Sequence, residues 1–285
     1  MAGSLLSVDL EDFTHDLQHR LGLDPTTRPE ALRRALGRIK EIVEGAPGSN
    51  RLTFFSTGQV ARDHGDILRE LVDEGHEIGC HGFYQYPPIH EMGRERFSRS
   101  LDKAIKAISQ ASGQPVNGFR APGFSIRHQD DWAYEELAKR FLYDSSWVSD
   151  TRDNPTHPTD VKVFGGDHLA EFPVFQCQLF PGFKARVIGG TYLKVLPLRT
   201  ILKLMHRAIE EGFLPLIYVH PYEFLHEGEF WVSNEELGNL APRKKAYWQI
   251  RQHQWLSMGN KRLARKLAEI LRVFPHQGVM AKHVR

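Results

Sequence analysis

The stretch HGDILRELVDEGHEIGCHG, residues 64–82, contains the repeating unit of the fold. Its first half places apolar residues at helical spacing and ends at Gly75, and its second half is a short apolar strand that ends at His81. A helix followed at once by a buried strand is typical of a parallel βα repeat. The stretch also brings an imidazole to a strand end, and a second histidine, His90, follows across Pro87 and Pro88.

The same alternation extends to both sides of this stretch. Residues 5–10 and 51–58 are predicted strands, and apolar residues at helical spacing between Leu32 and Val43 predict the helix that joins them. Further helices are expected over residues 97–108 and 198–212, and further strands in VNGFRAP (116–122), FLYDSSW (141–147), LAEFPVF (169–175) and FLPLIYVH (213–220). About seven βα units without a break in composition predict one α/β domain over residues 1–285, a distorted (β/α)7-type barrel.

Three segments do not follow this rhythm. Residues 149–167 and 176–191 are long, rich in Gly, Pro, Asp and Thr, and are interpreted either as walls of a site or as plain surface loops. Beyond residue 225 the chain continues as a polar extension, helical over about 242–271, and VFPHQGVM (273–280) is expected to form a last strand.

Composition excludes several classes of protein. The chain of 285 residues has a formal net charge of +2 with scattered basic residues, so it lacks the electrostatic footprint of a nucleic-acid-binding protein. Cys80 and Cys177 are its two cysteines, which favours a reducing compartment over secretion. No apolar run approaches the roughly 18 residues that span a bilayer, and the first residues lack the basic start of a signal peptide. We therefore expect a cytoplasmic protein without a transmembrane segment.

Polar residues of catalytic type stand at the ends of the predicted strands. The strand ends carry Asp9, Glu11, Asp12, His81, Arg120 and His220, and Glu171 lies inside another strand. In parallel barrels the carboxyl ends of the strands converge on the face where catalysis occurs. We therefore expect these carboxylates, imidazoles and the guanidinium to meet at one mouth.

The acidic cluster after the first strand has two interpretations. Asp9 and Glu11 point to the same side of an extended chain, and carboxylates this close repel one another unless a cation or a proton lies between them. A divalent metal bound by one of them, with the other taking a proton from water, would remove the repulsion. A solvated acidic strand end is the alternative.

The other polar residues also have structural alternatives. His81 could simply be a hydrogen-bonded structural histidine, and Arg120 could form an ordinary ion pair. His220 ends an apolar strand and precedes Pro221, so its ring has limited freedom and suits a general acid.

Taken in order, these segments resemble the polysaccharide deacetylase family, the NodB-type carbohydrate esterases, and within it the branch found with bacterial exopolysaccharide and O-antigen biosynthesis. The resemblance covers about residues 4–225 and is carried by SVDLEDF, LVDEGHEIGCHGF, GFRAPGFSI with YDSSW, EFPVF with GGTYLKVLP, and LPLIYVHPYEF. It implies an incomplete (β/α) barrel, a divalent metal, usually zinc, and hydrolysis of an N-acetyl group from a sugar.

The resemblance also implies roles for single residues. Asp9 would be the general base, Arg120 would orient it, and His220 would be the acid that protonates the leaving amine. Glu11 or Asp12 would be the metal carboxylate and His81 a metal ligand. Glu171 could pair with Arg120. Apart from the resemblance, aromatic residues near the proposed mouth, such as Phe124, Tyr192 and Tyr222, could stack on sugar rings or belong to the core.

One position departs from the family pattern. The family places a second histidine four residues after the first, and this chain has Gln85 there, a poorer zinc ligand than imidazole. Three interpretations stay open. His90 supplies the missing ligand in a metal-dependent deacetylase; or Asp9, Arg120 and His220 hydrolyse a linear or cyclic amide without tightly bound metal; or the chain is a non-catalytic sugar-binding relative. The sequence favours the first, and it specifies neither the sugar nor the oligomeric state.

Overall fold

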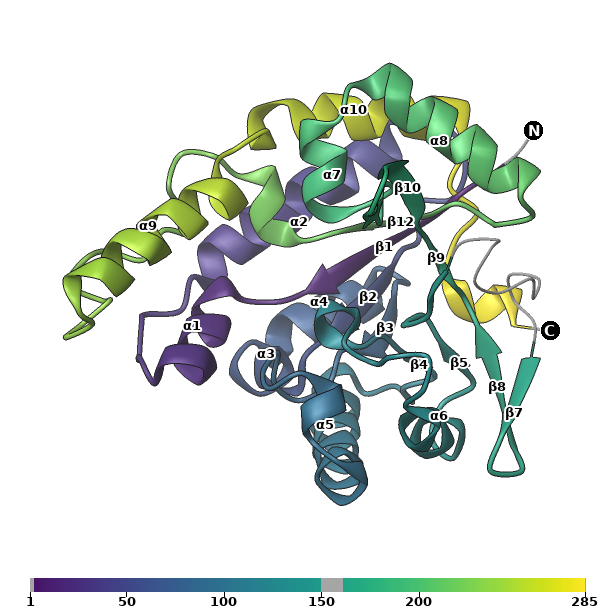
Figure 1. The fold of residues 1–285 in the computed structure, drawn as a ribbon, viewed down its shortest axis with the longest axis horizontal. Helices are drawn as coiled ribbons and strands as arrows, with labels where there is room; N and C mark the ends of the chain where they lie inside the picture. Colours follow the sequence, from purple (N-terminus) through teal and green to yellow (C-terminus); the bar gives the residue numbers. More distant parts are fainter. Residues whose placement is uncertain (1–2, 150–160, 285) are drawn as a thin grey trace.

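A single curled sheet organises the fold. In a computed structural model, which describes residues 3–149 and 161–284, eight strands form one sheet, seven of them parallel, with β7 antiparallel at one edge (Figure 1). Their order is β12 (Leu216–Val219), β1 (Leu5–Leu10), β2 (Thr53–Ser56), β3 (Glu77–Cys80), β4 (Gly118–Phe119), β5 (Tyr143–Asp144), β8 (Asp167–Glu171) and β7 (Val161–Phe164). The seven parallel strands form a half-barrel, which confirms the predicted distorted (β/α)7 fold.

Strand β1 lies between a strand from the N-terminal part of the chain and one from the C-terminal part. It pairs in parallel with β12 on one side, where Val8 lies opposite Val219, and with β2 on the other, where Asp9 lies opposite Phe55. Every residue of β1 is buried, as expected for a strand that is covered on both faces. Since parallel strands end at the same edge of a sheet, the residues that follow β1 and β12 emerge side by side.

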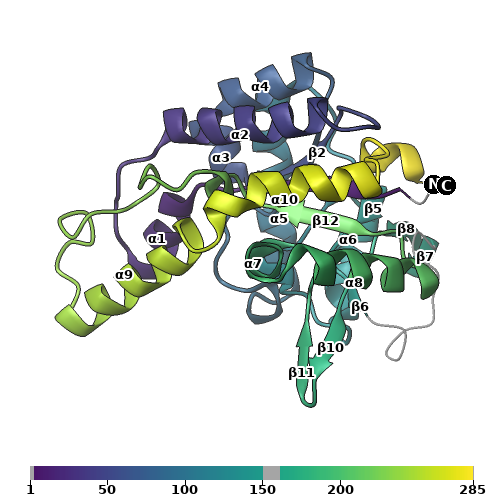
Figure 2. The same ribbon diagram turned by 90° about the horizontal axis from the view of Figure 1, so that it is seen from above.

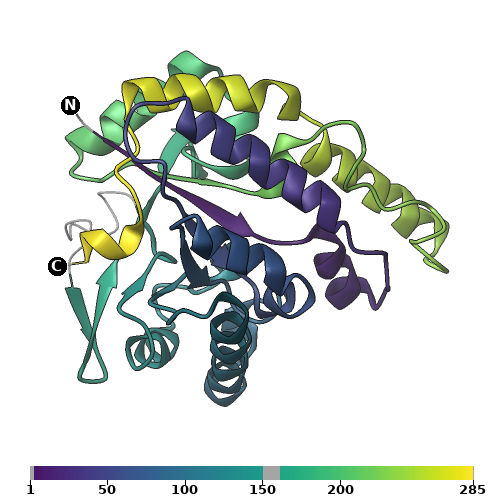
Figure 3. The same cartoon turned by 180° about the vertical axis from the view of Figure 1, so that it is seen from behind.

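Helices cover the sheet in the order that the βα repeats predict. They are α2 (Pro29–Glu44), α3 (Gly58–Asp63), α4 (Gly65–Asp73), α5 (Arg94–Ser112), α6 (Asp131–Ala138), α7 (Gly190–Val195), α8 (Leu198–Glu210), α9 (Pro242–Leu256) and α10 (Asn260–Val273). Figure 3 shows α2 and α10 running side by side, so the C-terminal extension covers the N-terminal part of the barrel. One cluster of buried apolar side chains extends from Leu6 to Phe274 and includes both.

A helix directly after β1 was not expected. Helix α1 (Phe13–Leu21) begins at Asp12, whose side chain accepts a hydrogen bond from the amide of Thr14, and ends at Gly22 with φ 66°. An N-terminal aspartate cap and a left-handed glycine are standard ends of a helix. Asp12 was interpreted as a strand-end carboxylate, and this capping role was missed.

The segments 149–167 and 176–191, which could have been plain surface loops, contain regular secondary structure. In the second, β10 (Cys177–Phe180) and β11 (Phe183–Ala185) form a hairpin that projects from the barrel (Figure 2), and α7 follows it. In the first, β7 and the start of β8 form the edge hairpin of the sheet. Residues 150–160 of that segment lie outside the described residues.

The expectation for the last residues was wrong in two respects. The predicted helix over 242–271 is divided into α9 and α10 around Gly259, which has φ 81°. Residues 273–280 form no strand: Pro275 has no amide hydrogen to donate, and the His276 ring instead accepts from the amide of Leu6 while its other nitrogen bonds the carbonyl of Arg51. Single bridges and a 3-10 turn (Met280–His283) follow.

Among the helices of the described residues, none has both the length and the apolar character needed to cross a membrane.

Candidate active site

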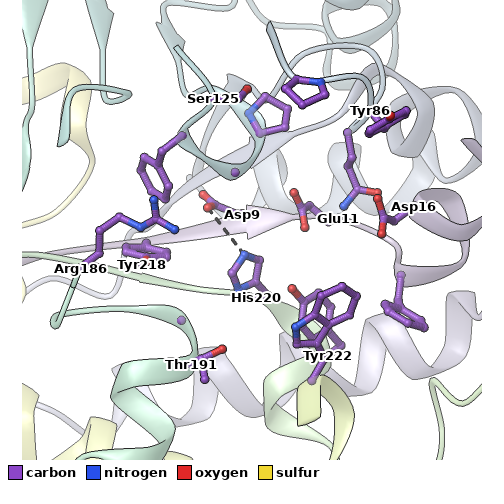
Figure 4. Close-up of a pocket in the computed structure, with 18 of the residues that line it drawn as sticks. Asp9, Glu11, Asp16, Tyr86, Ser125, Arg186, Thr191, Tyr218, His220 and Tyr222 are labelled. Carbon is purple, nitrogen blue, oxygen red and sulfur yellow. Dashed lines mark ion pairs between the residues drawn. The ribbon is translucent and has the colours of Figure 1, made fainter. Parts of the chain in front are cut away.

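A pocket of about 580 Å³ opens where the parallel strands end, and it collects most of the predicted site residues (Figure 4). Asp9 and Glu11 reach it from the end of β1, and His220 reaches it from the end of β12. Its wall also includes Gln85, His90, Arg186, Tyr192, Tyr218 and Tyr222. Convergence at the strand ends is what the alternation of strands and helices in the sequence predicts.

Asp9 is a buried carboxylate held by Arg120. Nη1 of Arg120 lies 2.7 Å from Oδ1 of Asp9, and both side chains are buried. The guanidinium also donates to Ser7 Oγ and to the side chain and carbonyl of Ser145, and it lies over the ring of Phe55. Burial alone would raise the pKa of Asp9, but Arg120, His81 and His220 lower it below its usual value. Asp9 is therefore ionised and fixed in one orientation.

His220 faces the free oxygen of Asp9. Its Nε2 lies 3.9 Å from Asp9 Oδ2, and its Nδ1 lies 3.4 Å from Oε2 of Glu223, whose carboxylate also accepts from the His220 amide (Figure 4). Burial lowers the pKa of His220, but Glu223, with Glu11 and Asp9, raises it to about 9. The Tyr222 ring stacks on the imidazole, with 5.0 Å between centroids. At neutral pH His220 is thus a protonated imidazole next to an ionised carboxylate, an acid and base pair.

Glu11 and His81 form a second pair at the pocket. His81 Nδ1 lies 2.7 Å from the carbonyl oxygen of Arg120, so Nδ1 must be the donor, since a carbonyl only accepts. Nε2 then faces Glu11 Oε1 at 2.9 Å. Two groups with lone pairs approach this closely only with a proton or a cation between them. A proton explains the 2.9 Å contact as well as a cation does, so what the pair offers a metal is its donor set, an imidazole nitrogen and a carboxylate oxygen.

Gln85 and His90 take different places from those expected. His90 Nδ1 lies 2.9 Å from the carbonyl oxygen of Ser125, and the ring does not join Glu11 and His81 in a three-ligand group within the described residues. The prediction that His90 supplies the missing imidazole is therefore not supported. Gln85 lines the pocket, and its buried Oε1 has no hydrogen-bond partner. Glu11 lines the same pocket, so Gln85 presents an unpartnered amide oxygen to the cavity that Glu11 faces.

Asp12 does not line the pocket. Its Oδ1 accepts from the amide and hydroxyl of Thr14, and its Oδ2 faces His64 rather than the pocket. With His15 and His64 it forms a compact buried group of potential ligands. Of the two carboxylates proposed for the pocket metal, Glu11 is the one that the geometry favours.

Of the three residues expected to contact the substrate, two line the pocket and one does not. Tyr192 and Tyr222 line the pocket. Glu171 accepts from the amide of Trp147 and is hydrogen-bonded to Asp144, and none of the bonds of Arg120 reaches it. Among the described residues Arg120 pairs with Asp9, so the structure gives the expected ion pair between Glu171 and Arg120 no support.

The sequence analysis missed Arg186, a residue of the pocket wall. Arg186 reaches the pocket beside Tyr218, with its guanidinium 4.7 Å from the centroid of the Phe124 ring and a buried Nε that has no hydrogen-bond partner (Figure 4). Phe124 itself has φ 58°, an unusual conformation for a residue with a side chain. The signal for Arg186 was its place in the segment 176–191, which had been interpreted as a possible wall of the site.

The fold and the paired acid and base define a class, the barrel hydrolases with a carboxylate and an imidazole at the strand ends. Residues 49–141 match the family model described as polysaccharide deacetylase, and residues 146–271 match a domain of unknown function, DUF3473. These matches and the relatives below support the polysaccharide deacetylase family for this chain, a family of hydrolases that act on N-acetyl amide bonds.

The curated relatives match through a limited region. A peptidoglycan deacetylase-like protein of Gibberella zeae is 30% identical over 39% of this chain and 32% of its own length, and a peptidoglycan deacetylase of Helicobacter pylori is 30% identical over 33% of this chain and 31% of its own. The chain thus spans about a third of the length of the curated relatives it matches.

Solved structures share the fold over nearly the whole chain. A polysaccharide deacetylase, so described provisionally, from Mycobacterium smegmatis has a TM-score of 0.50 at 20% identity and covers 96% of this chain and 93% of its own. A CE4 family pseudoenzyme from Bacillus anthracis has a TM-score of 0.52 at 13% identity and covers 99% and 66%. At these identities the likeness shows the fold alone.

Proposed function

We propose that this protein is a deacetylase that hydrolyses the N-acetyl group of a sugar in the biosynthesis of a bacterial surface polysaccharide, an exopolysaccharide or O-antigen. The observation that carries the proposal is the pairing of a fixed, ionised Asp9 with a protonated His220 at 3.9 Å inside the pocket. Amide hydrolysis needs both groups, because a base must activate water and an acid must protonate the nitrogen that leaves. The assignment to surface polysaccharides rests on the sequence resemblance.

The residues of the chain account for each proton transfer. Asp9 takes a proton from the water that attacks the acetyl carbonyl, and His220 gives its proton to the nitrogen as the C–N bond breaks, so the products are acetate and a free amine. Arg120 keeps Asp9 ionised and oriented through its 2.7 Å contact. Glu223 keeps His220 protonated before the reaction.

Glu11 and His81, with the amide oxygen of Gln85, would hold a divalent metal in this pocket. When bound, zinc or a similar ion would polarise the acetyl carbonyl and lower the pKa of water. The replacement of an imidazole by an amide oxygen predicts weaker zinc affinity than a site with two histidines would have. Aromatic rings of Tyr192 and Tyr222 line the same pocket, where they can stack on a sugar ring.

The test is acetate release from N-acetylated sugars offered free, nucleotide-linked and lipid-linked. We expect turnover by the wild type and a loss of at least a hundredfold in Asp9→Asn and in His220→Gln, with Asp24→Asn and His206→Gln as matched controls at exposed sites. Loss of turnover with a chelator and recovery with zinc would support the metal-dependent enzyme. Turnover that survives the chelator would favour hydrolysis of a linear or cyclic amide without tightly bound metal.

A non-catalytic relative is the remaining candidate, and the likeness to a pseudoenzyme structure keeps it in the test. Sugar binding without acetate release, unchanged in Asp9→Asn, would contradict the proposed function and favour this candidate. We also propose a cytoplasmic location, which the low number of cysteines, Cys80 and Cys177, supports.

A further inference from the structure

A second group of potential metal ligands lies next to the pocket without lining it. Asp12, His15 and His64 each place one ligand atom within 4.8 Å of the other two, and all three are buried, at 1%, 4% and 5% exposure. Asp12 caps α1 and His15 lies in its first turn, while His64 is the joint between α3 and α4. Figures 1 and 3 show α1 beside α3, the two elements that this group joins.

Several polar atoms of this group make no hydrogen bond within the described part of the chain. Asp12 Oδ2, His64 Nε2 and both ring nitrogens of His15 are buried without a hydrogen bond. Each such atom costs about 1–3 kcal/mol unless something satisfies it. A single ion that contacts one atom of each side chain would satisfy three of the four, and Asp63 Oδ2 lies 3.2 Å from the fourth, His15 Nε2.

The spacing and the donor types fit a metal ion. Asp12 Oδ2 and His64 Nε2 are 3.5 Å apart, long for a hydrogen bond but close to the roughly 3.3 Å that separates two ligands of a tetrahedral ion with bonds of about 2 Å. Two imidazoles and one carboxylate suit zinc and its neighbours, whereas calcium and magnesium prefer oxygen ligands.

A neighbouring carboxylate supports the same interpretation. Asp63 Oδ2 lies 3.2 Å from Nε2 of His15, and Arg62 already forms a two-point ion pair with Asp63. A carboxylate next to a ligand histidine is the common means of fixing its ring. Asp63 therefore fits a role in orienting His15.

We propose that Asp12, His15 and His64 form a second site for zinc or a similar transition-metal ion, separate from the pocket. None of the three lines the pocket. The ion would join the first turn of α1 to the joint between α3 and α4, and because Asp12 directly follows Glu11, it would also fix the backbone that presents Glu11 to the pocket. The role of this ion is structural. The proposed site is therefore a property of the protein in addition to its proposed deacetylase activity.

The test separates this site from the pocket. The background is Glu11→Gln/His81→Ala, which removes two of the three ligands proposed for the pocket. Metal-free protein of this background is titrated with Zn²⁺ and with Co²⁺, and its bound metal is counted by elemental analysis. We expect one equivalent of bound zinc and a higher melting temperature with zinc. The absorption spectrum of the cobalt-bound protein should be typical of an ion with a low coordination number. Adding Asp12→Asn or His64→Ala to this background should weaken binding at least tenfold and abolish the thermal shift, while His206→Ala should change neither.

Asp12→Asn keeps the protein folded for this comparison, because asparagine is as good a helix cap as aspartate. Far-UV circular dichroism of the metal-free variants checks this. The proposal is overturned if the pocket-deleted background takes up no zinc, or if it keeps its zinc when Asp12 and His64 are replaced. The count of bound metal does not depend on acetate release, so failure here is distinct from failure of the proposed function.

Discussion

Arg120 contacts both halves of the candidate catalytic site. Its guanidinium lies 2.7 Å from the carboxylate of Asp9, and its backbone carbonyl accepts the Nδ1 hydrogen of His81 at 2.7 Å. One residue therefore fixes the base through its side chain and sets the tautomer of the candidate metal ligand through its main chain. The residue is fully buried, so no water can replace either contact.

Replacement of Arg120 should destabilise the protein strongly. Arg120→Met leaves the Asp9 carboxylate buried without its partner, and we expect a loss of about 3–5 kcal/mol in the free energy of unfolding, measured by urea denaturation. Asp9→Asn/Arg120→Met should recover part of this loss, because the uncompensated charge is gone. Equal stability of Arg120→Met and the wild type would show that the ion pair does not hold the site.

The activity should fall in alkaline solution. His220 must carry a proton to act as the acid, and its raised pKa of about 9 keeps it protonated at neutral pH. Activity that depends on this proton is present below pH 9 and is lost as the pH rises through that value. A profile of kcat against pH measures the limb directly.

Glu223→Gln tests the cause of that limb. Glu223 makes the largest favourable contribution to the pKa of His220, so its replacement should move the alkaline limb to lower pH while the residual activity keeps the same bell shape. Glu227→Gln, at an exposed position, is the matched control. An unmoved limb in Glu223→Gln would show that another group titrates.

Arg186 should contribute to substrate binding. Within the described residues its guanidinium has no carboxylate partner, and it lies against Phe124 and Tyr218 at the pocket wall. We expect Arg186→Met to raise KM by roughly 10-fold or more for a substrate with an anionic group near the acetamide, since a charge-assisted hydrogen bond contributes about 1.5–3 kcal/mol. The kcat should change much less. An equal effect on kcat and on kcat/KM would instead place Arg186 in the transition state.

Gly189 should not tolerate a side chain. A Cβ there would lie 2.2 Å from the ring of Tyr218, which is buried in the pocket wall. Gly189→Ala should therefore cost about 1–3 kcal/mol of stability through overpacking. Gly37→Ala is the control: Gly37 lies in α2 with no atom near the added methyl, and the substitution should stabilise the helix by about 0.5–1 kcal/mol. Melting curves of both variants distinguish these opposite effects.

Local sequence patterns predicted the barrel and the convergence of its polar strand ends, because both depend on periodicity and on the direction of parallel strands. They did not predict where Asp12 and His90 would point. Asp12 lies two residues after the end of β1 and caps α1, and its hydrogen bond with the amide of Thr14 turns it from the pocket toward His64. His90 is placed by a contact with Ser125, far along the chain. Such tertiary contacts leave no local signal.

Arg186 escaped prediction for a related reason. It follows a hairpin whose strands are short, and its place in the pocket depends on Phe124 and Tyr218, which come from two other segments. A single arginine in a polar segment has no periodicity that marks it as functional. Only the composition of the segment hinted at a site wall.

The pairing of β1 with β12 governs when the protein can become active during its synthesis. The proposed base, Asp9, lies in β1 and the proposed acid, His220, follows β12, so a nascent chain whose β12 is still inside the ribosome carries the base without the acid. Domains fold as they emerge, but here the last parallel strand completes the reaction centre. Activity should therefore appear only after β12 has emerged, and a fragment of residues 1–212 should be inert until residues 213–285 are supplied as a separate chain.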